Sequence, residues 1–331
     1  MKFGVLQFFS WSRRIPLETV YARAMERIAI MDEGGYDAVW LAEHHFSTYS
    51  VCPSINVMGT HVAAHTKNLR IGTAVSLAAF YHPLRLAEEI ALLDVLSGGR
   101  VNWGAGRGFD PTEFRAFGVA PDESAERFLE AVDIVRLAWQ DERLTYHGKF
   151  WDFENIDVLP KPLQKPGPPV WVAATSHESI ERAAARGHTI LMDPHASHAE
   201  IGRKRQLYRE SLARHGHSEE GRTIPVARLL AVAATDAEAE EVARQGAAWT
   251  VGSYASPRGK QSNSGIDRSP EDDPVERYVR DVVIHGSPER VVDEILGLRD
   301  EADVDYLMCA PLSHESFVLF TEQVMPRLIS A

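Results

Sequence analysis

The sequence predicts an α/β protein whose eight parallel strands close into a (β/α)8 barrel, the TIM barrel. Short apolar runs rich in β-formers alternate with helical segments along the whole chain. Strict alternation of strands and helices implies right-handed crossovers and a parallel sheet. Eight such units fit a chain of 331 residues, so we expect one barrel domain over residues 1–331. An open, doubly wound sheet is the main rival, because periodicity alone does not exclude it.

The first half of the chain supplies four of the expected strands. They are predicted at residues 3–9, 37–41, 69–75 and 101–105. Helices are predicted at residues 17–33, 54–65, 83–96 and 124–139. The helix over 83–96 has the clearest ends, because Pro83 suits a first helical position and the Gly98-Gly99 pair suits a termination. A small hairpin around a glycine turn is predicted at residues 144–153.

The second half repeats the alternation after a proline-rich surface connection over residues 160–169. Strands are predicted at residues 170–173, 189–192, 224–232 and 304–308. Helices are predicted from residue 176 and over residues 198–214, 236–249, 287–298 and 313–328. Residues from about 250 to 281 are polar and rich in Ser, Gly and Pro. Connections of that length are usually functional lids or disordered, so we expect a mobile lid there.

Composition excludes several classes of protein. Lys plus Arg is 35 and Asp plus Glu is 47, so the net charge is −12. Binding to nucleic acid or to an anionic membrane would need a clustered basic surface instead. Two cysteines, Cys52 and Cys309, suit a reducing compartment, and no apolar run approaches the length of a membrane span. The first residues indicate a strand rather than a signal peptide, so we expect a cytoplasmic enzyme.

The first candidate site is the run Glu43-His44-His45-Phe46, directly after the second predicted strand. In a barrel this position lies on the catalytic rim, at the carboxyl ends of the strands. Histidine exchanges protons near neutral pH, which suits general acid–base chemistry. A rim histidine that only forms hydrogen bonds is the alternative. An acid beside two histidines at a strand end favours a functional role.

The second candidate is the stretch from Trp103 to Gly108, at the end of the fourth predicted strand. Its glycines let the backbone approach a ligand, and Arg107 offers a planar, charged group suited to phosphate. A dinucleotide-binding fingerprint is excluded, because the spacing is Gly-x-Gly-x-Gly and we expect Asp110-Pro111 to follow without a helix. A glycine-rich turn with a solvated Arg107 remains the alternative.

The third candidate lies at residues 173–179, where a strand leads into a helix. Thr175 or Ser176 suits the N-cap, and the free N–H groups of a first helical turn can bind an anion. Capping alone would also explain these residues, but Arg107 on the same rim makes a phosphate site plausible. His61 and His65 have metal-ligand spacing without the Glu of a zinc protease helix, so we expect no metal site.

At these residues the chain resembles the luciferase-like flavin-dependent monooxygenases, especially the bacterial luciferase α-subunit type. The matching stretches follow the family's order and spacing over nearly the whole chain: residues 39–46, 71–75, 82–89, 92–100, 106–108, 181–187 and 286–289. The resemblance implies a TIM-barrel oxidoreductase that binds FMN as FMNH2 supplied by a separate flavin reductase. Such an enzyme forms a flavin C4a-peroxide with O2 and passes one oxygen atom to a small organic substrate.

The resemblance also implies the roles of individual residues at the flavin. His44 matches the family's catalytic histidine, and Arg107 matches the arginine that pairs with the flavin phosphate. Ser176 and Ser179, with the backbone of Thr175, match the phosphate cradle.

Four further residues are expected near the flavin ring. Ala74 and Val75 fall where the family carries a non-prolyl cis peptide beneath the ring. Glu43 is expected near the ring. Gly106 stands where the luciferase α-subunit has a reactive cysteine.

The resemblance says less about the substrate and the assembly. Candidates for the substrate side are Phe8, His45, Met192 and Trp249. A homodimer is expected, with residues 82–100 near the interface. Hydroxylation, epoxidation and Baeyer–Villiger insertion all remain open, with a natural-product intermediate as one candidate substrate. Light emission is not expected, because the cysteine and the tryptophans near the flavin of luciferase are absent here.

Two other functions remain open. One is a deazaflavin-dependent hydride-transfer enzyme on the same barrel, although such enzymes usually lack the Glu-His-His run. The other is a non-catalytic partner subunit like the luciferase β-subunit. Retention of both His44 and Arg107 argues against that subunit.

Overall fold

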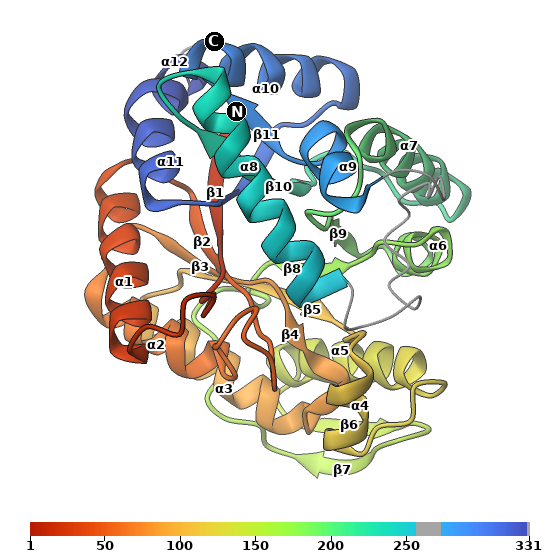
Figure 1. Ribbon diagram of the computed structural model, residues 1–331. Helices are drawn as coiled ribbons and strands as arrows, with labels where there is room; N and C mark the ends of the chain where they lie inside the picture. Colours follow the sequence, from red (N-terminus) through yellow and green to blue (C-terminus); the bar gives the residue numbers. More distant parts are fainter. Residues whose placement is uncertain (256–272, 330–331) are drawn as a thin grey trace.

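The computed structural model describes residues 1–255 and 273–329, and its parallel sheet curls into the predicted barrel (Figure 1). Eight strands form the wall, and their order around it follows the chain: β1 (Lys2–Gln7), β2 (Ala38–Leu41), β3 (Arg70–Thr73), β5 (Val101–Gly106), β8 (Val170–Ala173), β9 (Thr189–Leu191), β10 (Pro225–Val232) and β12 (Tyr306–Pro311). A parallel bridge between Met192 and Val226 joins the end of β9 to β10 and closes the ring.

The helices surround this wall (Figure 1). Their bounds lie close to the predicted ones: α1 (Leu17–Glu33), α2 (Ile55–His65), α3 (Pro83–Ser97), α5 (Ser124–Gln140), α6 (His177–Ala185), α7 (His198–Arg214), α8 (Asp236–Thr250) and α10 (Pro288–Ala302). Pro83 opens α3, and Gly98 ends it in the left-handed conformation that glycine adopts without strain. The last predicted helix is divided by a π-turn at Phe320–Val324 into α11 (His314–Leu319) and α12 (Met325–Ile329).

Several short elements were not predicted. Contrary to the prediction, a helix does follow Asp110: this residue caps α4 (Pro111–Phe117) by accepting the Thr112 N–H at 2.7 Å. Strands β4 (Ser76–Leu77) and β11 (Ile284–Gly286) extend the sheet. The short helix η1 (Ala78–Phe80) follows β4.

The two predicted insertions differ in how far the structure describes them. The hairpin forms from β6 (Leu144–His147) and β7 (Asp152–Ile156), as predicted. The predicted lid begins with the π-turn η2 (Val251–Ala255) and ends with helix α9 (Pro274–Asp281). Its residues 256–272 lie outside the described part of the chain.

Large side chains fill the barrel beneath its carboxyl-terminal rim. Trp40 and Tyr306 are buried there, and the Trp40 indole donates a 2.9 Å hydrogen bond to the Tyr306 hydroxyl. Gly72 makes room for them, because a Cβ there would lie 2.3 Å from the Trp40 ring. In barrels with a packed interior of this kind, ligands bind at the carboxyl-terminal rim. Among the described residues, no helix is long and apolar enough to span a membrane.

Candidate active site

A cavity of about 320 Å³ lies at the carboxyl ends of the barrel strands. Residues that follow six consecutive strands line it: Phe8 after β1, His44 after β2, Val75 after β3, Arg107 after β5, Ser176 after β8 and Asp193 after β9. The three candidate sites of the sequence therefore meet in one cavity. Parallel strands bring their carboxyl ends to the same rim, which explains why residues so distant in sequence meet here.

His44 lies in an aromatic setting on the cavity wall. Its ring stacks on Phe8, with centroids 6.2 Å apart and planes at 21°. Tyr49 meets the same imidazole edge-on at 5.3 Å. The backbone N–H of His44 donates to the Cys52 carbonyl at 3.2 Å, which fixes the chain at this point. These contacts hold the imidazole at the cavity, where it is half-buried.

Glu43 is a buried carboxylate in the same wall, only 2% exposed. Its oxygens accept hydrogen bonds from the Tyr81 hydroxyl at 2.9 Å and the Leu77 N–H at 3.2 Å. His45 Nε2 lies 3.0 Å from the same carboxylate. Burial and the Glu43 charge raise the pKa of Tyr81, so its phenol keeps its proton and acts as a donor. Three partners therefore compensate the burial of this charge.

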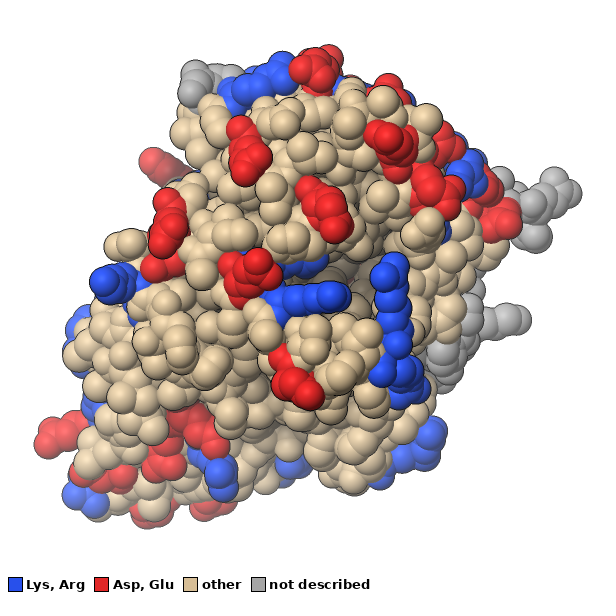
Figure 2. Space-filling model, turned by 60° about the vertical axis from the view of Figure 1, so that its left-hand side comes forward, with Lys and Arg blue, Asp and Glu red and all other residues tan. Residues whose placement is uncertain are grey.

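Two arginines lie on the cavity wall. Arg107 follows β5, and Arg182 comes from α6, where its guanidinium is 2.5 Å from the Glu178 carboxylate. Partial desolvation lowers the pKa of Arg107, and the neighbouring positive charge of Arg182 lowers it further. Arginine side chains in general keep their positive charge in proteins. On the face shown in Figure 2, basic side chains border a hollow among scattered acidic groups. Glu178 already neutralises Arg182, so it is Arg107 that favours an anion in the cavity.

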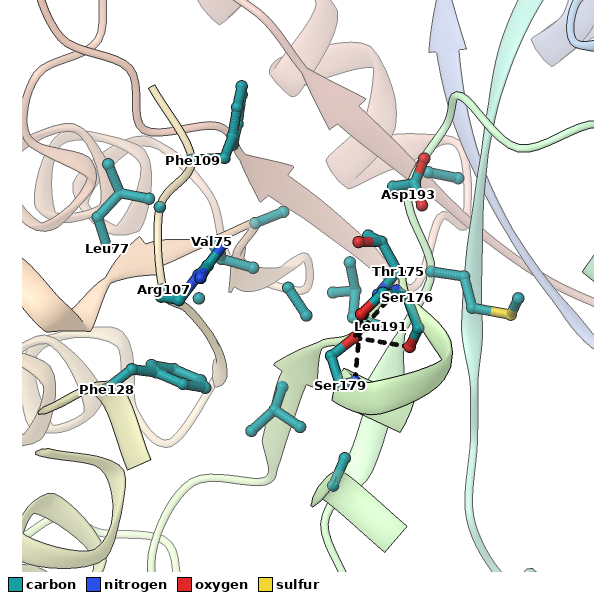
Figure 3. A pocket seen from close by; sticks show the side chains of 18 of the residues that line it. Val75, Leu77, Arg107, Phe109, Phe128, Thr175, Ser176, Ser179, Leu191 and Asp193 are labelled. Carbon is teal, nitrogen blue, oxygen red and sulfur yellow. Dashed lines mark hydrogen bonds between the residues drawn. The ribbon is translucent and has the colours of Figure 1, made fainter. Parts of the chain in front are cut away.

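The start of α6 lies across the cavity from Arg107 (Figure 3). Ser176 and Ser179 form a capping box, in which the Ser179 N–H donates to Ser176 Oγ at 3.2 Å. The backbone N–H groups of Thr175 and Ser176 converge on Ser179 Oγ at 3.1 and 3.0 Å. Hydroxyl and N–H groups gathered at a helix N-terminus are suited to a phosphate.

Close packing at the floor of the cavity requires a glycine at position 106. The peptide bond between Ala74 and Val75 is cis and non-prolyl, as the resemblance implied. A Cβ on Gly106 would lie 2.3 Å from Val75 Cγ2, and another on Gly108 would lie 2.9 Å from the Phe80 ring. The backbone therefore packs too closely here for a side chain such as cysteine.

Comparison with known proteins shows the family of the chain. The sequence model of the family described as luciferase-like monooxygenase matches residues 1–305. The chain belongs to the luciferase-like monooxygenase family. Protein y4wF of Sinorhizobium fredii is 41% identical over 51% of this chain and 50% of its own length. The oxygenase component of flavin-dependent trigonelline monooxygenase from Acinetobacter baylyi is 33% identical over 53% of this chain and 49% of its own length. The chain thus spans about half the length of these curated relatives.

Solved structures of luciferase-like proteins share the whole fold. Monooxygenase RslO1 from Streptomyces bottropensis superposes with a TM-score of 0.85 and 27% identity, covering 99% of this chain and 100% of that one. An F420-dependent secondary alcohol dehydrogenase has the same fold at 17% identity, with a TM-score of 0.78 and coverage of 98% of each chain. The fold is therefore shared by a monooxygenase and by an F420-dependent alcohol dehydrogenase.

Most of the predicted site residues line the cavity, but His45 and Trp249 do not. Phe8 and Met192, two of the candidates for the substrate side, line it. The His45 ring is turned toward Glu43 and packs edge-on against Phe117 at 4.8 Å, so it is not among the lining residues. Trp249 lies on α8, which packs against α9 and β11 rather than along the cavity.

Asp193 also lines the cavity; the resemblance placed it where luciferase has tryptophans near the flavin. Two other lining residues were missed from sequence: His195, which follows β9, and Arg182, which lies one turn inside α6. The strand-end position of His195 was a usable signal, whereas Arg182 carried none. Among the described residues no group of three or more His, Cys, Asp or Glu side chains is placed to hold a metal ion. His61 and His65 do lie together on α2, with ring centroids 4.4 Å apart.

Proposed function

We propose that this luciferase-like protein is the oxygenase component of a two-component flavin monooxygenase. A separate flavin reductase would supply FMNH2, and the enzyme would insert one atom of O2 into a small organic substrate. One observation carries the proposal: a single cavity is lined by Arg107, by the serine-capped start of α6 and by the half-buried imidazole of His44. Hydroxylation, epoxidation and Baeyer–Villiger insertion, including oxidation of a natural-product intermediate, are the reactions to test.

Each part of the cavity has a role in this proposal. Arg107 and the α6 start, with Ser176, Ser179 and the Thr175 backbone, would hold the flavin phosphate. Ala74, Val75 and Gly106 would support the ring, and the Glu43 carboxylate would lie near its edge. Bound reduced flavin supplies the electrons that activate O2.

The chain's own residues would then control protons and water. His44 would hold or donate the proton that the oxygen transfer requires. The apolar wall of Leu6, Phe8, Met192 and Met308 would bind the substrate body. Exclusion of water by such a wall prevents wasteful side reactions.

The cofactor decides between this proposal and the deazaflavin alternative. The fold of the F420-dependent alcohol dehydrogenase keeps that alternative open. Anaerobic titration of the purified chain with reduced FMN and with reduced F420 compares the two affinities directly. We expect the chain to bind reduced FMN more tightly. Preference for F420, with no binding of FMN, would overturn the monooxygenase proposal.

Reaction with oxygen provides the second test. The chain loaded with reduced FMN is mixed with O2 in a stopped-flow spectrometer, and the flavin spectrum is followed. We expect slow, multiphase reoxidation in the wild type and altered phases in His44→Ala. Wild-type reoxidation as fast as that of free FMN in the mixture would contradict the proposal.

Arg107→Ala is expected to weaken binding of reduced FMN about tenfold or more, whereas Arg115→Ala on the exposed side of α4 is the matched control.

We also propose a homodimer formed through α2 and α3, in the cytoplasm. These helices pack side by side and expose apolar side chains, with Val57 72%, Leu92 47% and Leu96 56% exposed. Exposed apolar patches of this kind mark protein–protein interfaces. The buried free thiols of Cys52 and Cys309 fit a reducing compartment.

A further inference from the structure

A carboxylate lies in the cavity wall at the end of β9. Asp193 follows this strand directly and lines the cavity. Figure 3 shows it on the same side of the cavity as Thr175 and Ser176, across from Arg107. The Asp193 side chain is 18% exposed, so it is largely shielded from solvent and still accessible from the cavity.

The backbone fixes the orientation of this carboxylate. Asp193 Oδ1 accepts the N–H of His195 at 2.9 Å. The Arg228 guanidinium holds the same loop, because it donates to the carbonyl of Ala196 at 2.6 Å and to that of Pro194 at 3.3 Å. With Oδ1 engaged, Oδ2 is the oxygen left for another donor, and no hydrogen bond reaches it from the described part of the chain.

A buried lysine lies behind Oδ2. Lys204 on α7 is 9% exposed and is not among the residues that line the cavity. Its Nζ is 3.8 Å from Asp193 Oδ2 and 3.8 Å from Glu200 Oε1, which is too far for a hydrogen bond. Lys204 therefore offsets the charge of Asp193 but leaves the hydrogen-bonding capacity of Oδ2 unused.

The other carboxylates of the cavity wall are in a different situation. Glu43 is buried, but protein donors hold both of its oxygens. Glu178 is paired with Arg182, and its side chain is 76% exposed, so water reaches it. Asp193 is shielded from water and has an oxygen to which no described residue donates. Leaving such an acceptor without a donor is unfavourable, so a ligand that supplies a donor is stabilised there.

The surroundings of Asp193 indicate the kind of donor. Lys204 lies beside the carboxylate, and the charge of Asp193 also favours the charged form of the buried Arg228. Since two cations already balance this charge, a neutral hydroxyl suffices as the donor. Hydrogen bonds from a hydroxyl to an ionised carboxylate are short and about twice as strong as neutral ones. The neighbouring wall is apolar and is formed by Leu191, Met192, Ala227 and Met308.

We propose that Asp193 is a substrate-binding residue whose Oδ2 accepts a hydrogen bond from a hydroxyl group of the substrate. The apolar wall takes the carbon skeleton, so the substrate class is a neutral, largely apolar alcohol or phenol. The inference rests on the proposed function, because it assigns the substrate side of the same cavity. Asp193 then determines specificity, since a substrate without a donor leaves the carboxylate unpaired.

Nuclear magnetic resonance of the FMN-loaded chain, with aspartate labelled with ¹³C at the side-chain carboxyl carbon, tests this assignment. The signal of Asp193 is identified by its loss in Asp193→Asn. The probes are phenol and toluene, which share a shape but differ in the hydroxyl group. Phenol is expected to shift the Asp193 signal, and toluene is expected to leave it in place. An unmoved signal with phenol, or equal shifts with both probes, would overturn the proposal.

Variants separate binding from structure. Asp193→Asn is expected to weaken phenol binding about tenfold, because the hydrogen bond loses its charge, and to leave toluene binding unchanged. Asp236→Asn is the matched control. Asp236 Oδ1 accepts the Ser287 N–H at 2.7 Å and Oδ2 is 3.5 Å from Arg290, but this residue does not line the cavity. The control should keep the wild-type affinity for both probes. Equal losses for phenol and toluene in Asp193→Asn would assign Asp193 a structural role instead.

FMN binding by the same variants separates the substrate from the cofactor. FMN affinity is expected to be unchanged in Asp193→Asn. A loss of FMN affinity as large as the loss of phenol affinity would assign the carboxylate to the flavin and overturn the inference. If the wild type does not bind FMN, the proposed function fails, and titration of the FMN-free chain with phenol still decides the role of Asp193.

Discussion

The Ser179 hydroxyl accepts the backbone N–H of Ser176 at 3.0 Å, which ties the first turn of α6 to the loop before it. The same hydroxyl accepts the Thr175 N–H at 3.1 Å. A phosphate that binds here would share these donors with the serine. These bonds hold the start of α6 in one shape, which is the shape that the proposed phosphate site would use.

Ser179→Ala should therefore weaken FMN binding as well as the helix. Loss of the N3 side of the capping box costs about 1 kcal/mol of folding stability, and loss of one hydroxyl contact lowers FMN affinity about fivefold. Fluorescence titration with FMN and urea denaturation measure the two effects. Glu238→Ala is the matched control, because Glu238 is the N3 residue of the capping box of α8, away from the cavity. Equal FMN affinity in both variants would exclude Ser179 from the phosphate site.

Gly106→Ala should be poorly tolerated. The new Cβ would lie 2.3 Å from Cγ2 of Val75, a β-branched side chain with little freedom to move. Overpacking of this kind costs about 1–3 kcal/mol, and the cavity floor should shift with it. Thermal unfolding with and without FMN measures both consequences. Gly297→Ala on α10 meets no atom within 4 Å and should stabilise the protein by about 0.5–1 kcal/mol. A Gly106→Ala protein as stable as the wild type would contradict the close packing.

Glu294 should make the protein less stable as the pH rises. Burial raises its pKa from the ordinary 4.5 to about 7, although Arg290 and Arg228 oppose the shift. Between these pH values the folded state keeps a proton that the unfolded chain has released, so the free energy of unfolding falls as pH rises.

Glu294→Gln removes this titration while keeping a polar side chain. The variant should match the wild type near pH 4.5 and exceed its free energy of unfolding by up to about 3 kcal/mol at pH 8. Urea denaturation at a series of pH values measures the difference. Asp293→Asn, on the exposed side of the same helix, is the control. A difference that shrinks with rising pH would have the wrong sign for a raised pKa.

Leu96→Asp should dissociate the proposed dimer. The side chain is 56% exposed on α3, and a charge placed in an apolar interface is costly to desolvate. Light scattering after size-exclusion chromatography should show a dimer for the wild type and a monomer for the variant. Ile329→Asp on α12 changes a similarly exposed residue outside this face and should remain dimeric. A wild-type protein that is monomeric at micromolar concentration would contradict the proposed homodimer.

Much of the architecture could be predicted from local sequence. The α3 helix begins at Pro83 and ends at Gly98 because these residues favour the required backbone conformations. The eight strand segments follow from β-rich apolar runs, and strict alternation selects a parallel barrel. In such a barrel the residues that follow the strands lie on the carboxyl-terminal rim, which places His44, Arg107 and Ser176 on the same rim.

The tertiary structure decided what local pattern leaves open. His44 and His45 are neighbours in sequence, yet only His44 lines the cavity, because Glu43 and Phe117 hold the His45 ring on the other side. Helix α4 after Asp110 was missed, because its seven residues are too few for a clear periodicity.

The sequence by itself determined the fold, the family and the rim residues, because strand propensity, turn residues and capping act over short distances. Only the tertiary structure showed that the charge of Arg182 acts on Arg107. Only it showed that Arg228 bonds the carbonyl next to His195 and that the Tyr278 hydroxyl lies beside the His195 ring. Those contacts join residues from 32 to 83 positions apart in the chain. The direction of a side chain at the rim depends on such distant partners, which no local pattern encodes.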